Sequence, residues 1–201
     1  MGKIFCLMGK SSSGKDTIFK KLRERDELGL RPVVTYTTRP MRQNETNGVE
    51  YYFINEETLK EYVTAGKVIE KRVYHTVFGD WYYCTIDDGQ IKLDQEDYLL
   101  IVTLEAYNSL KKYFGEENVV PLYVALEDGV RLERALQREK QEITPNYDEV
   151  CRRFLADNQD FSKENLQSSG VEKQYINIDL EKCIEEITED ILKNKERPKY
   201  N

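Results

Sequence analysis

The stretch GKSSSGKDT, residues 9–17, decides the fold of this chain. A glycine, four further residues and a Gly-Lys pair form the frame of a phosphate-binding loop, whose backbone N–H groups and lysine surround phosphate oxygens. The residue after the lysine is commonly Ser or Thr, because its hydroxyl helps to hold magnesium. Here that residue is Asp16, and Thr17 follows one place later. The stretch therefore predicts a phosphate cradle with an altered metal contact.

The residues on either side of this stretch are those that a phosphate-binding loop needs. Residues 3–9, KIFCLMG, form a short apolar run that ends in glycine, which predicts a buried strand. In residues 15–28, Ile18, Leu22 and Leu28 recur near helical spacing among charged residues, which predicts an amphipathic helix. A GxxxxGK pattern can arise by chance, but a strand before it and a helix after it favour a working loop.

Strands and helices alternate along the rest of the chain. Apolar or alternating segments predict strands, and stretches with helical periodicity predict helices. The expected strands are 31–40, 48–54, 67–78, 80–86, 97–104, 118–126 (broken early by Pro121) and 174–179, and the expected helices are 55–65, 105–115, 127–141, 146–161 and 180–195. This order predicts an α/β fold with a parallel sheet covered by helices on both faces, and a small antiparallel insertion within residues 36–84.

The composition limits the function classes. The chain has 201 residues, of which 39% are hydrophobic and 33% charged, as is typical of one globular domain. Its net charge of −7 argues against nucleic-acid binding driven by charge, and no apolar run approaches the length of a membrane span. We expect the first strand, not a signal peptide, at the N-terminus, and hence a cytoplasmic protein.

The cysteines and the single histidine offer no metal site. Cys6, Cys84, Cys151 and Cys183 are scattered without a CxxC pair, so we expect free, buried thiols rather than zinc ligands or disulfides. His75 is the one histidine, which excludes a metal cluster built from several histidines, and we expect it to have no catalytic role.

Asp16 allows three interpretations. A carboxylate beside triphosphate oxygens is repulsive unless a cation lies between them, so Asp16 could contact magnesium through water. Thr17 could supply the missing hydroxyl instead. Alternatively, Asp16 is simply an acidic residue in the first turn of a helix, where the helix dipole favours it. The loop binds phosphate under all three interpretations.

Three further segments predict a second binding site. Arg39 and Arg42 in TTRPMR (37–42) lie three residues apart around a proline, and guanidinium groups bind phosphate in a bidentate way. Tyr51 in NGVEYYF adds a phenol. Glu70 in VIEKR could read guanine, whose N1–H and exocyclic amine are adjacent donors. Taken alone, Glu70 is more simply a solvated charge at the end of a strand.

Arginines gather on two consecutive predicted helices. Arg131, Arg134 and Arg138 share one helical face, and Arg152 and Arg153 follow on the next helix. The segment QEITPN between the helices predicts a short mobile lid, whose arginines could stabilise charge on a transferring phosphoryl group. The alternative is a solvated helical face, since several glutamates lie nearby. We favour a functional role for Arg134, Arg138 and Arg153.

In this order the motifs resemble those of the guanylate kinase family. That family has a phosphate-binding loop, a TTRxPR-like segment, NGxxYxF, FxE, YGT/S, an acidic strand end, and a lid with RLxxR and a further arginine. The chain shows GKSSSGKD, TTRPMR, NGVEYYF, VIE, FGD, VTLE, and RALQR followed by CRRF, from about residue 3 to residue 192. TTRPMR with NGVEYYF is the specific part, because the loop alone fits many nucleotide-binding proteins.

The resemblance implies an ATP-dependent nucleoside monophosphate kinase that converts ATP and GMP into ADP and GDP with Mg2+. It implies one domain of residues 1–201 with the P-loop kinase fold. The parts would be a core of about 1–34, 97–133 and 154–197, a nucleoside monophosphate-binding insertion of about 35–96, and a helical lid of about 134–153. The partners would be small nucleotides, not nucleic acid or a membrane, and the protein would be a monomer or a homodimer.

The site residues follow from the same resemblance. Phosphoryl transfer would depend on Lys15, Arg39, Arg134, Arg138 and Arg153. ATP would contact Gly9, Lys10, Ser11, Ser12, Ser13, Gly14, Lys15, Asp16 and Thr17, and Mg2+ would contact Asp16 or Thr17 through water. GMP would contact Thr35, Arg39, Arg42, Tyr51, Glu70, Phe78, Gly79, Asp80 and Thr103.

Three departures from the family pattern concern the acceptor. Phe78 replaces a tyrosine that contacts the acceptor phosphate, Asp80 replaces a base-reading Ser or Thr, and Thr103 with Glu105 replaces an acidic pair. One alternative is therefore a kinase of the same build for another nucleotide or a small phosphorylated acceptor. The other is a non-catalytic guanylate kinase-like binding module, against which the intact Gly-Lys loop and the lid arginines argue. A phosphate acceptor is mostly ionised at neutral pH, so the transfer needs no general base.

Overall fold

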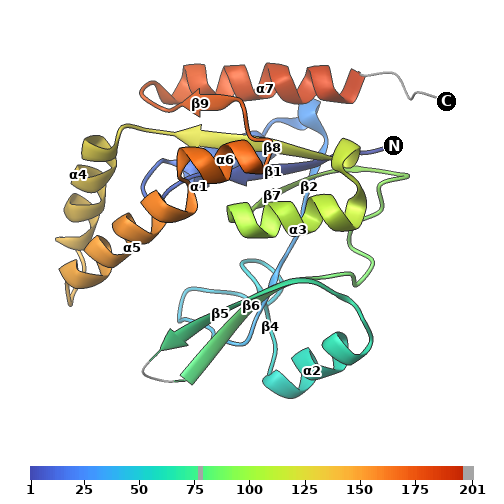
Figure 1. The fold of residues 1–201 in the computed structure, drawn as a ribbon, viewed down its shortest axis with the longest axis horizontal. Helices are drawn as coiled ribbons and strands as arrows, with labels where there is room; N and C mark the ends of the chain where they lie inside the picture. The colour runs from blue at the N-terminus through green and yellow to red at the C-terminus, as the bar shows by residue number, and fades with distance from the viewer. Residues whose placement is uncertain (77–78, 197–201) are drawn as a thin grey trace.

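The computed structural model describes residues 1–76 and 79–196, which form two sheets with their helices (Figure 1). The larger sheet has five strands, all parallel. Their order across the sheet is β2 (Leu30–Pro32), β7 (Asp97–Ile101), β1 (Ile4–Met8), β8 (Val119–Ala125) and β9 (Gln174–Ile176). The predicted α/β architecture is therefore confirmed, and β1, which leads into the GKSSSGKDT stretch, lies at the centre of the sheet.

Helices cover both faces of this sheet, so its central strand is buried throughout. Phe5 and Leu7 of β1 pack against α1 (Lys15–Arg23) and α7 (Leu180–Glu196). The alternate residues Ile4, Cys6 and Met8 pack on the other face against α3 (Leu104–Phe114) and α6 (Lys163–Ser168). A strand with two covered faces requires a continuous apolar run, which is what residues 4–8 supply.

The smaller sheet lies below the larger one in Figure 1, together with α2 (Glu56–Thr64). Its strands are β4 (Tyr52–Phe53), β3 (Tyr36–Thr37), β6 (Gly79–Ile86) and β5 (Val68–Thr76), and β5 and β6 form the predicted antiparallel unit. Leu59 of α2 packs against Cys84 of β6. Asn55 caps α2 as predicted, because its side chain accepts a hydrogen bond from Thr58 N–H at 2.8 Å.

The single strand predicted at 31–40 is wrong, because the chain changes sheets within it. β2 belongs to the larger sheet and β3 to the smaller one. Val34 lies between them, and its N–H and C=O bond to the side-chain amide of Gln90 at 3.0 and 3.1 Å. The segment that enters the smaller sheet before β3 and the segment that leaves it after β6 are therefore joined by these two hydrogen bonds.

Other elements also differ from the prediction. The segment 48–54 pairs only at Tyr52–Phe53, since Gly48 N–H bonds Tyr51 C=O in a turn just before it. β8 passes through Pro121 without a break: Pro121 lies beside Cys6 of β1, and β9 begins only opposite Tyr123. One side of Pro121 thus faces no strand, and proline is tolerated at a strand position that is unpaired on one side. The helix predicted at 15–28 ends at Arg23, and α6 has no counterpart among the predicted elements.

The two arginine-bearing helices, α4 (Asp128–Glu139) and α5 (Tyr147–Asp160), extend away from the larger sheet at the left of Figure 1. Three of the four cysteines are buried as expected, but Cys151 on α5 is exposed. The neighbouring Val150 is the residue that α5 buries, and successive residues of a helix point about 100° apart.

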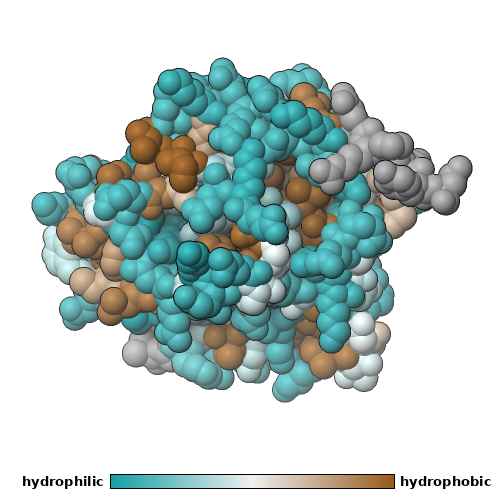
Figure 2. All heavy atoms as spheres, turned by 45° about the horizontal axis from the view of Figure 1, so that its top comes forward, coloured by the Kyte–Doolittle hydropathy of each residue, from teal (hydrophilic) through white to brown (hydrophobic). Residues whose placement is uncertain are grey.

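Hydrophilic side chains cover most of the face drawn in Figure 2, and hydrophobic ones form separate patches. In the part of the chain that the structure describes, no helix combines the length and the apolar character needed to cross a membrane.

Candidate active site

The GKSSSGKDT loop connects β1 to α1, and neighbouring strands fix its backbone. Gly14 has a φ of 90°, and a Cβ placed on it would lie 2.3 Å from the side-chain nitrogen of Asn177. Asn177, just beyond β9, donates a hydrogen bond to Ser13 C=O at 2.7 Å. A Cβ on Gly9 would lie 2.6 Å from Val124 C=O. Both glycines of the motif are therefore required by close packing, and at Gly14 by conformation as well.

The start of α1 can accept an anion. No side chain caps its first turn, so its backbone N–H groups and the positive end of the helix dipole face the loop. Lys15 Nζ lies 3.7 Å from Asp16 Oδ2, and the Asp16 side chain is 75% exposed. Asp16 and Thr17 thus offer oxygen atoms at the mouth of the loop.

Arg131 fixes the lid helices to the loop and is itself buried. It donates hydrogen bonds to Ser11 C=O at 3.0 Å, to Asp128 at 2.7 Å and to Asn158 at 3.1 Å, and its guanidinium lies over the ring of Phe154. The side chain is 1% exposed. The structure therefore separates Arg131 from the other arginines of its helix, because its donors are used inside the protein.

Asp157 and Asn158 of α5 are contacts of the loop that the sequence does not reveal. Asp157 Oδ2 accepts a hydrogen bond from Ser11 N–H at 2.7 Å, and Asn158 Oδ1 accepts one from Lys10 Nζ at 2.7 Å. These residues lie 146 and 148 positions from their partners in the loop, and no spacing pattern connects them. Together with Arg131 they couple the loop directly to α4 and α5.

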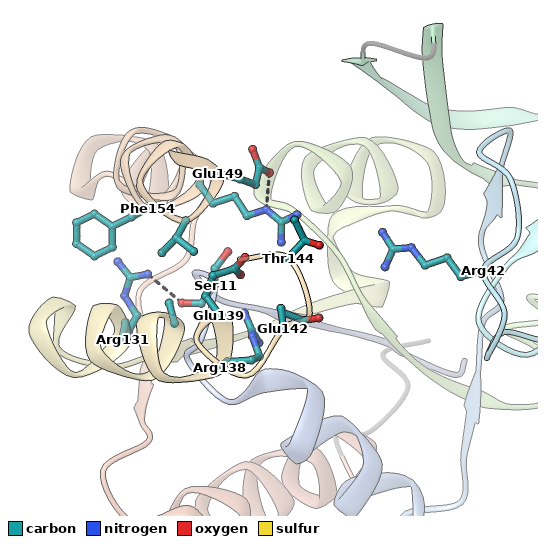
Figure 3. A pocket seen from close by; sticks show the side chains of 12 residues that line it. Ser11, Arg42, Arg131, Arg138, Glu139, Glu142, Thr144, Glu149 and Phe154 are labelled. Carbon is teal, nitrogen blue, oxygen red and sulfur yellow. Dashed lines mark hydrogen bonds and ion pairs between the residues drawn. The ribbon is translucent and has the colours of Figure 1, made fainter. Parts of the chain in front are cut away.

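A cavity of about 480 Å³ lies between the loop, the lid helices and the insertion (Figure 3). Arg138 of α4, Arg153 of α5 and Arg42 of the segment before β4 line it, with Ser11 of the loop. In Figure 3, Arg42 points across the cavity toward the lid helices. Besides Arg131, whose donors bond protein oxygens, three guanidinium groups from the insertion and the lid line this space, an arrangement that suits an anionic ligand with several phosphates.

Carboxylates share this cavity with the arginines. Glu149 Oε1 accepts a hydrogen bond from Arg153 Nε at 2.7 Å, and its Oε2 accepts one from Arg152 Nε at 2.7 Å. The bonds from Arg152 and then from Arg153 lower the pKa of Glu149 to about 2. Glu149 therefore stays ionised and holds Arg153 at the cavity wall.

Arg134 does not line this cavity. It lines a second cavity of about 240 Å³ with Gly14, Thr17, Asn177 and Ile178. The side chain of Ile178 is largely exposed there. The predicted group of three lid arginines is thus divided: Arg138 and Arg153 face the larger cavity, and Arg134 faces the smaller one.

Arg39 is buried and paired with Glu45, a residue that sequence reasoning missed. Its two terminal nitrogens bond the two Glu45 oxygens at 2.7 and 2.5 Å, and its Nε bonds the hydroxyl of Tyr83 at 3.1 Å. The guanidinium also lies 5.4 Å from the ring centre of Tyr51. Arg39 and Tyr51 therefore meet as predicted, but the carboxylate of Glu45 fills the fork that was expected to bind phosphate. An acidic residue six positions after Arg39 is the only signal of this in the sequence.

The Arg39–Glu45 pair predicts a dependence of stability on pH. The hydrogen bonds from Arg39 lower the pKa of Glu45 from 4.5 to about 2. A lowered folded-state pKa contributes stability that is complete above pH 4.5 and is lost as the pH falls toward 2. We expect the difference in unfolding free energy between wild type and Glu45→Gln to shrink over this window in urea titrations. The exposed Glu57→Gln is the control, and a difference that does not change with pH would contradict the pairing.

Glu70 is buried, so its interpretation as a solvated strand-end charge is wrong. It is 7% exposed, because Thr85 of β6 lies opposite it and donates a hydrogen bond to Oε1 at 2.9 Å. Arg72 Nε bonds Oε2 at 3.1 Å. Thr35 is half-buried just before β3, and its C=O accepts a bond from Tyr52 N–H. These residues lie on the smaller sheet.

The remaining predicted acceptor residues are placed as follows. Thr103 follows β7, and its hydroxyl caps α3 by accepting a bond from Ala106 N–H at 3.3 Å. Asp80 of β6 pairs with Nδ1 of His75 at 2.7 Å, and both side chains are exposed. Gly79 begins β6. Phe78 lies outside the described residues.

Comparisons with known proteins cover nearly the whole chain. The family model described as guanylate kinase matches residues 1–190. A guanylate kinase of Porphyromonas gingivalis is 25% identical over 189 residues, which are 93% of this chain and 95% of that protein. A guanylate kinase of Thermosynechococcus vestitus is 28% identical over 91% of this chain and 90% of its own length.

One solved structure supports the same architecture. The crystal structure of guanylate kinase from Anaplasma phagocytophilum matches with a TM-score of 0.68 and 21% sequence identity, over 98% of this chain and 87% of that chain. At this identity the likeness bears on the fold alone.

Proposed function

The chain belongs to the guanylate kinase family, and on that premise we propose how its own residues transfer a phosphoryl group from ATP to GMP. The observation that carries the proposal is the cavity of about 480 Å³ in which Arg42, Arg138 and Arg153 converge beside the loop. Donor and acceptor phosphates meet in this cavity. Their negative charges are neutralised by arginines from the insertion and from the lid.

The donor ATP binds along the loop. Lys15 and the uncapped start of α1 hold its phosphates, and the other loop residues supply backbone N–H groups. We place the adenosine in the smaller cavity beside Gly14, where the exposed Ile178 offers an apolar surface and Arg134 a cation. This position directs the terminal phosphate toward Arg138 and Arg153.

Magnesium fits the oxygen atoms at the mouth of the loop. Mg2+ is usually bound through one or two protein oxygens together with phosphate oxygens and waters. Asp16 and Thr17 are exposed and follow Lys15 directly, so they would hold the ion, and Asp16 would do so through water. When bound, Mg2+ neutralises phosphate charge.

The acceptor GMP binds on the smaller sheet. Arg42 reaches the phosphate of GMP across the cavity. Arg39 and Tyr51, which contact each other, support the phosphate-binding segment, and Glu70 faces the guanine. Glu45 orients Arg39, because it accepts both terminal nitrogens of that side chain. Transfer then depends on positioning and on charge neutralisation, since the acceptor's phosphate oxygen is already ionised.

We divide the chain into a core of about 1–34, 97–133 and 154–197, an insertion of about 35–96 and a lid of about 134–153. The tie between Val34 and Gln90 supports the first boundary, because it joins the two segments that lead into and out of the smaller sheet. Closure of insertion and lid over the cavity would exclude water, which otherwise competes as acceptor. We place this reaction in the cytoplasm, where unpaired thiols persist.

A panel of acceptors tests the function. Purified protein with ATP and Mg2+ is offered GMP, dGMP, AMP, CMP, UMP and dTMP, and release of ADP is measured. We expect turnover with the guanine nucleotides only. Selective turnover with another base would show a kinase of the same build with a different acceptor. A lack of turnover with all six, together with a lack of ATP binding, would leave a non-catalytic binding module.

A further inference from the structure

Arg72 is a cation of the acceptor site that the proposed roles leave unused. Glu70, Arg72 and Tyr74 alternate along β5 and therefore point to one face of the smaller sheet. Thr85 and Tyr83 lie opposite the first two on β6. This face is separate from the one on which Cys84 and α2 form the small hydrophobic core.

Other contacts show that this face borders the nucleotide site. The ring of Tyr83 lies 5.6 Å from that of Tyr51, and its hydroxyl accepts the bond from Arg39. The ring of Tyr74 lies 5.2 Å from that of Tyr83. Arg72 therefore lies beside Glu70, and Tyr83 opposite it connects it to Tyr51 and Arg39.

The guanidinium of Arg72 has unfilled donor capacity. Its side chain is 20% exposed, and its Nε bonds Glu70 Oε2 at 3.1 Å. Among the described residues, its two terminal nitrogens have no hydrogen-bond partner. A guanidinium carries five N–H donors, and the terminal nitrogens of Arg72 are not among the buried, unpartnered polar atoms of the described residues, so they are accessible from outside. A ligand on this face can therefore supply an acceptor atom to them.

Arg72 also keeps its charge in this position. Burial acts to lower the pKa of its guanidinium, but the carboxylate of Glu70 outweighs burial, so the pKa lies above its ordinary value. The two side chains thus present a permanent donor and a carboxylate acceptor next to each other.

This pattern matches the edge of guanine. Its O6 is an acceptor, and the adjacent N1–H and 2-amino group are donors. Arginine is the side chain that most commonly donates to O6 in base recognition. Adenine in the same pose would place an amino donor against Arg72 and an unprotonated ring nitrogen against Glu70, so both contacts would be repulsive.

We propose that Arg72 is a specificity-determining residue, which donates a hydrogen bond to O6 of the acceptor base while Glu70 accepts from N1–H and the 2-amino group. This inference rests on the proposed function, since it assumes that the base lies against Glu70. It assigns to the pair the selection of 6-oxopurines.

The test compares GMP with 6-thio-GMP, in which a sulfur atom, a weaker acceptor, replaces O6. The quantity is the ratio of kcat/KM for the two nucleotides, measured for wild type, Arg72→Met and Arg72→Lys. We expect wild type to have a higher kcat/KM for GMP than for 6-thio-GMP. In Arg72→Met, kcat/KM for GMP should fall about tenfold because KM rises, and the ratio of kcat/KM for the two nucleotides should be close to one. Arg72→Lys should keep an intermediate ratio, because it retains a donor and the charge.

Arg31→Met is the matched control. Arg31 Nε bonds Glu96 at 2.9 Å in the same way, but on β2 of the larger sheet and with a 65% exposed side chain. The Arg31→Met variant should keep the wild-type KM for GMP and the wild-type ratio of kcat/KM for GMP and 6-thio-GMP. Thermal unfolding and ATP affinity show whether each variant is folded.

Two results would overturn the inference. The first is a wild type with equal efficiency for the two nucleotides. The second is an Arg72→Met variant whose kcat/KM falls by the same factor for GMP and for 6-thio-GMP. That result would mean that Arg72 acts on Glu70 or on the phosphate and not on O6. If wild type phosphorylates neither nucleotide, the proposed function fails instead, and the same ratio taken from calorimetric dissociation constants decides the role of Arg72.

Discussion

Replacing Lys15 with Met is expected to lower kcat for phosphoryl transfer by about a thousandfold or more, while the protein remains folded. Lys15 is the first residue of α1, so its positive charge lies at the end of the loop where the helix begins. Among the described residues, its ion-pair partner is the exposed Asp16 at 3.7 Å, so its removal leaves no buried charge without a partner. Single-turnover rates with saturating ATP and GMP, together with a thermal unfolding curve, measure the two effects.

Lys21→Met is the control for this experiment. Lys21 lies on the same helix and pairs with Glu181 at 2.6 Å, and its side chain is 41% exposed. It should leave both kcat and the unfolding midpoint close to wild type, because exposed ion pairs contribute little. If Lys15→Met were as active as wild type, the assignment of GKSSSGKDT as the phosphate loop would be refuted.

Replacing Arg39 with Ala is expected to destabilise the protein by about 3–5 kcal/mol and to weaken the acceptor. Arg39 is 4% exposed and Glu45 is 14% exposed, so the substitution leaves a largely enclosed carboxylate with only the Arg42 N–H as a hydrogen-bond donor. The loss is a large share of the total stability of a domain of this size. Urea denaturation followed by circular dichroism measures the stability, and initial rates at varied GMP and varied ATP measure the two substrates.

Arg42→Ala separates the stability effect from the acceptor effect. Arg42 is exposed and lines the large cavity, so its removal should raise KM for GMP with little change in stability. The double variant Arg39→Met/Glu45→Leu should recover much of the lost stability, since it removes both charges together. An Arg39→Ala protein with wild-type stability would contradict the buried pair. A defect confined to ATP would show that Arg39 serves the donor.

Local sequence patterns predicted those parts of the site whose chemistry lies within a few residues. The buried strand, the glycines and Lys15 were readable together, because a phosphate loop needs only a strand end, a tight turn and a helix start. The cap at Asn55 and the β5–β6 hairpin were readable for the same reason. The family resemblance placed Arg39 and Arg42 at the acceptor phosphate and Arg134, Arg138 and Arg153 on the lid side. Of these five residues, Arg42, Arg138 and Arg153 line one cavity.

Contacts between segments that are distant in the chain could not be predicted from the sequence. The two terminal nitrogens of Arg39 bond the carboxylate of Glu45, although the sequence predicts that they bind phosphate. The bond from Ser11 N–H to Asp157 joins residues 146 positions apart, and no local propensity records it. The sequence predicts a strand broken at Pro121, but the strand continues, because β9 begins only opposite Tyr123 and leaves one side of the proline unpaired.

The sequence by itself determined that this protein has an α/β fold with a phosphate-binding loop at the end of its first strand, and it pointed to a nucleotide kinase. Periodicity, glycine spacing and the order of motifs are properties of neighbouring residues, so they survive in the sequence alone. Only the tertiary structure decided which charges face the ligand and which face each other. Arg131 and Arg39 donate their hydrogen bonds to protein oxygens, Arg131 at the wall of the cavity, whereas Arg42, Arg138 and Arg153 line the cavity with exposed or partly exposed side chains. Burial and pairing depend on what the fold brings alongside each side chain, and arginines of equal charge therefore acquire different roles.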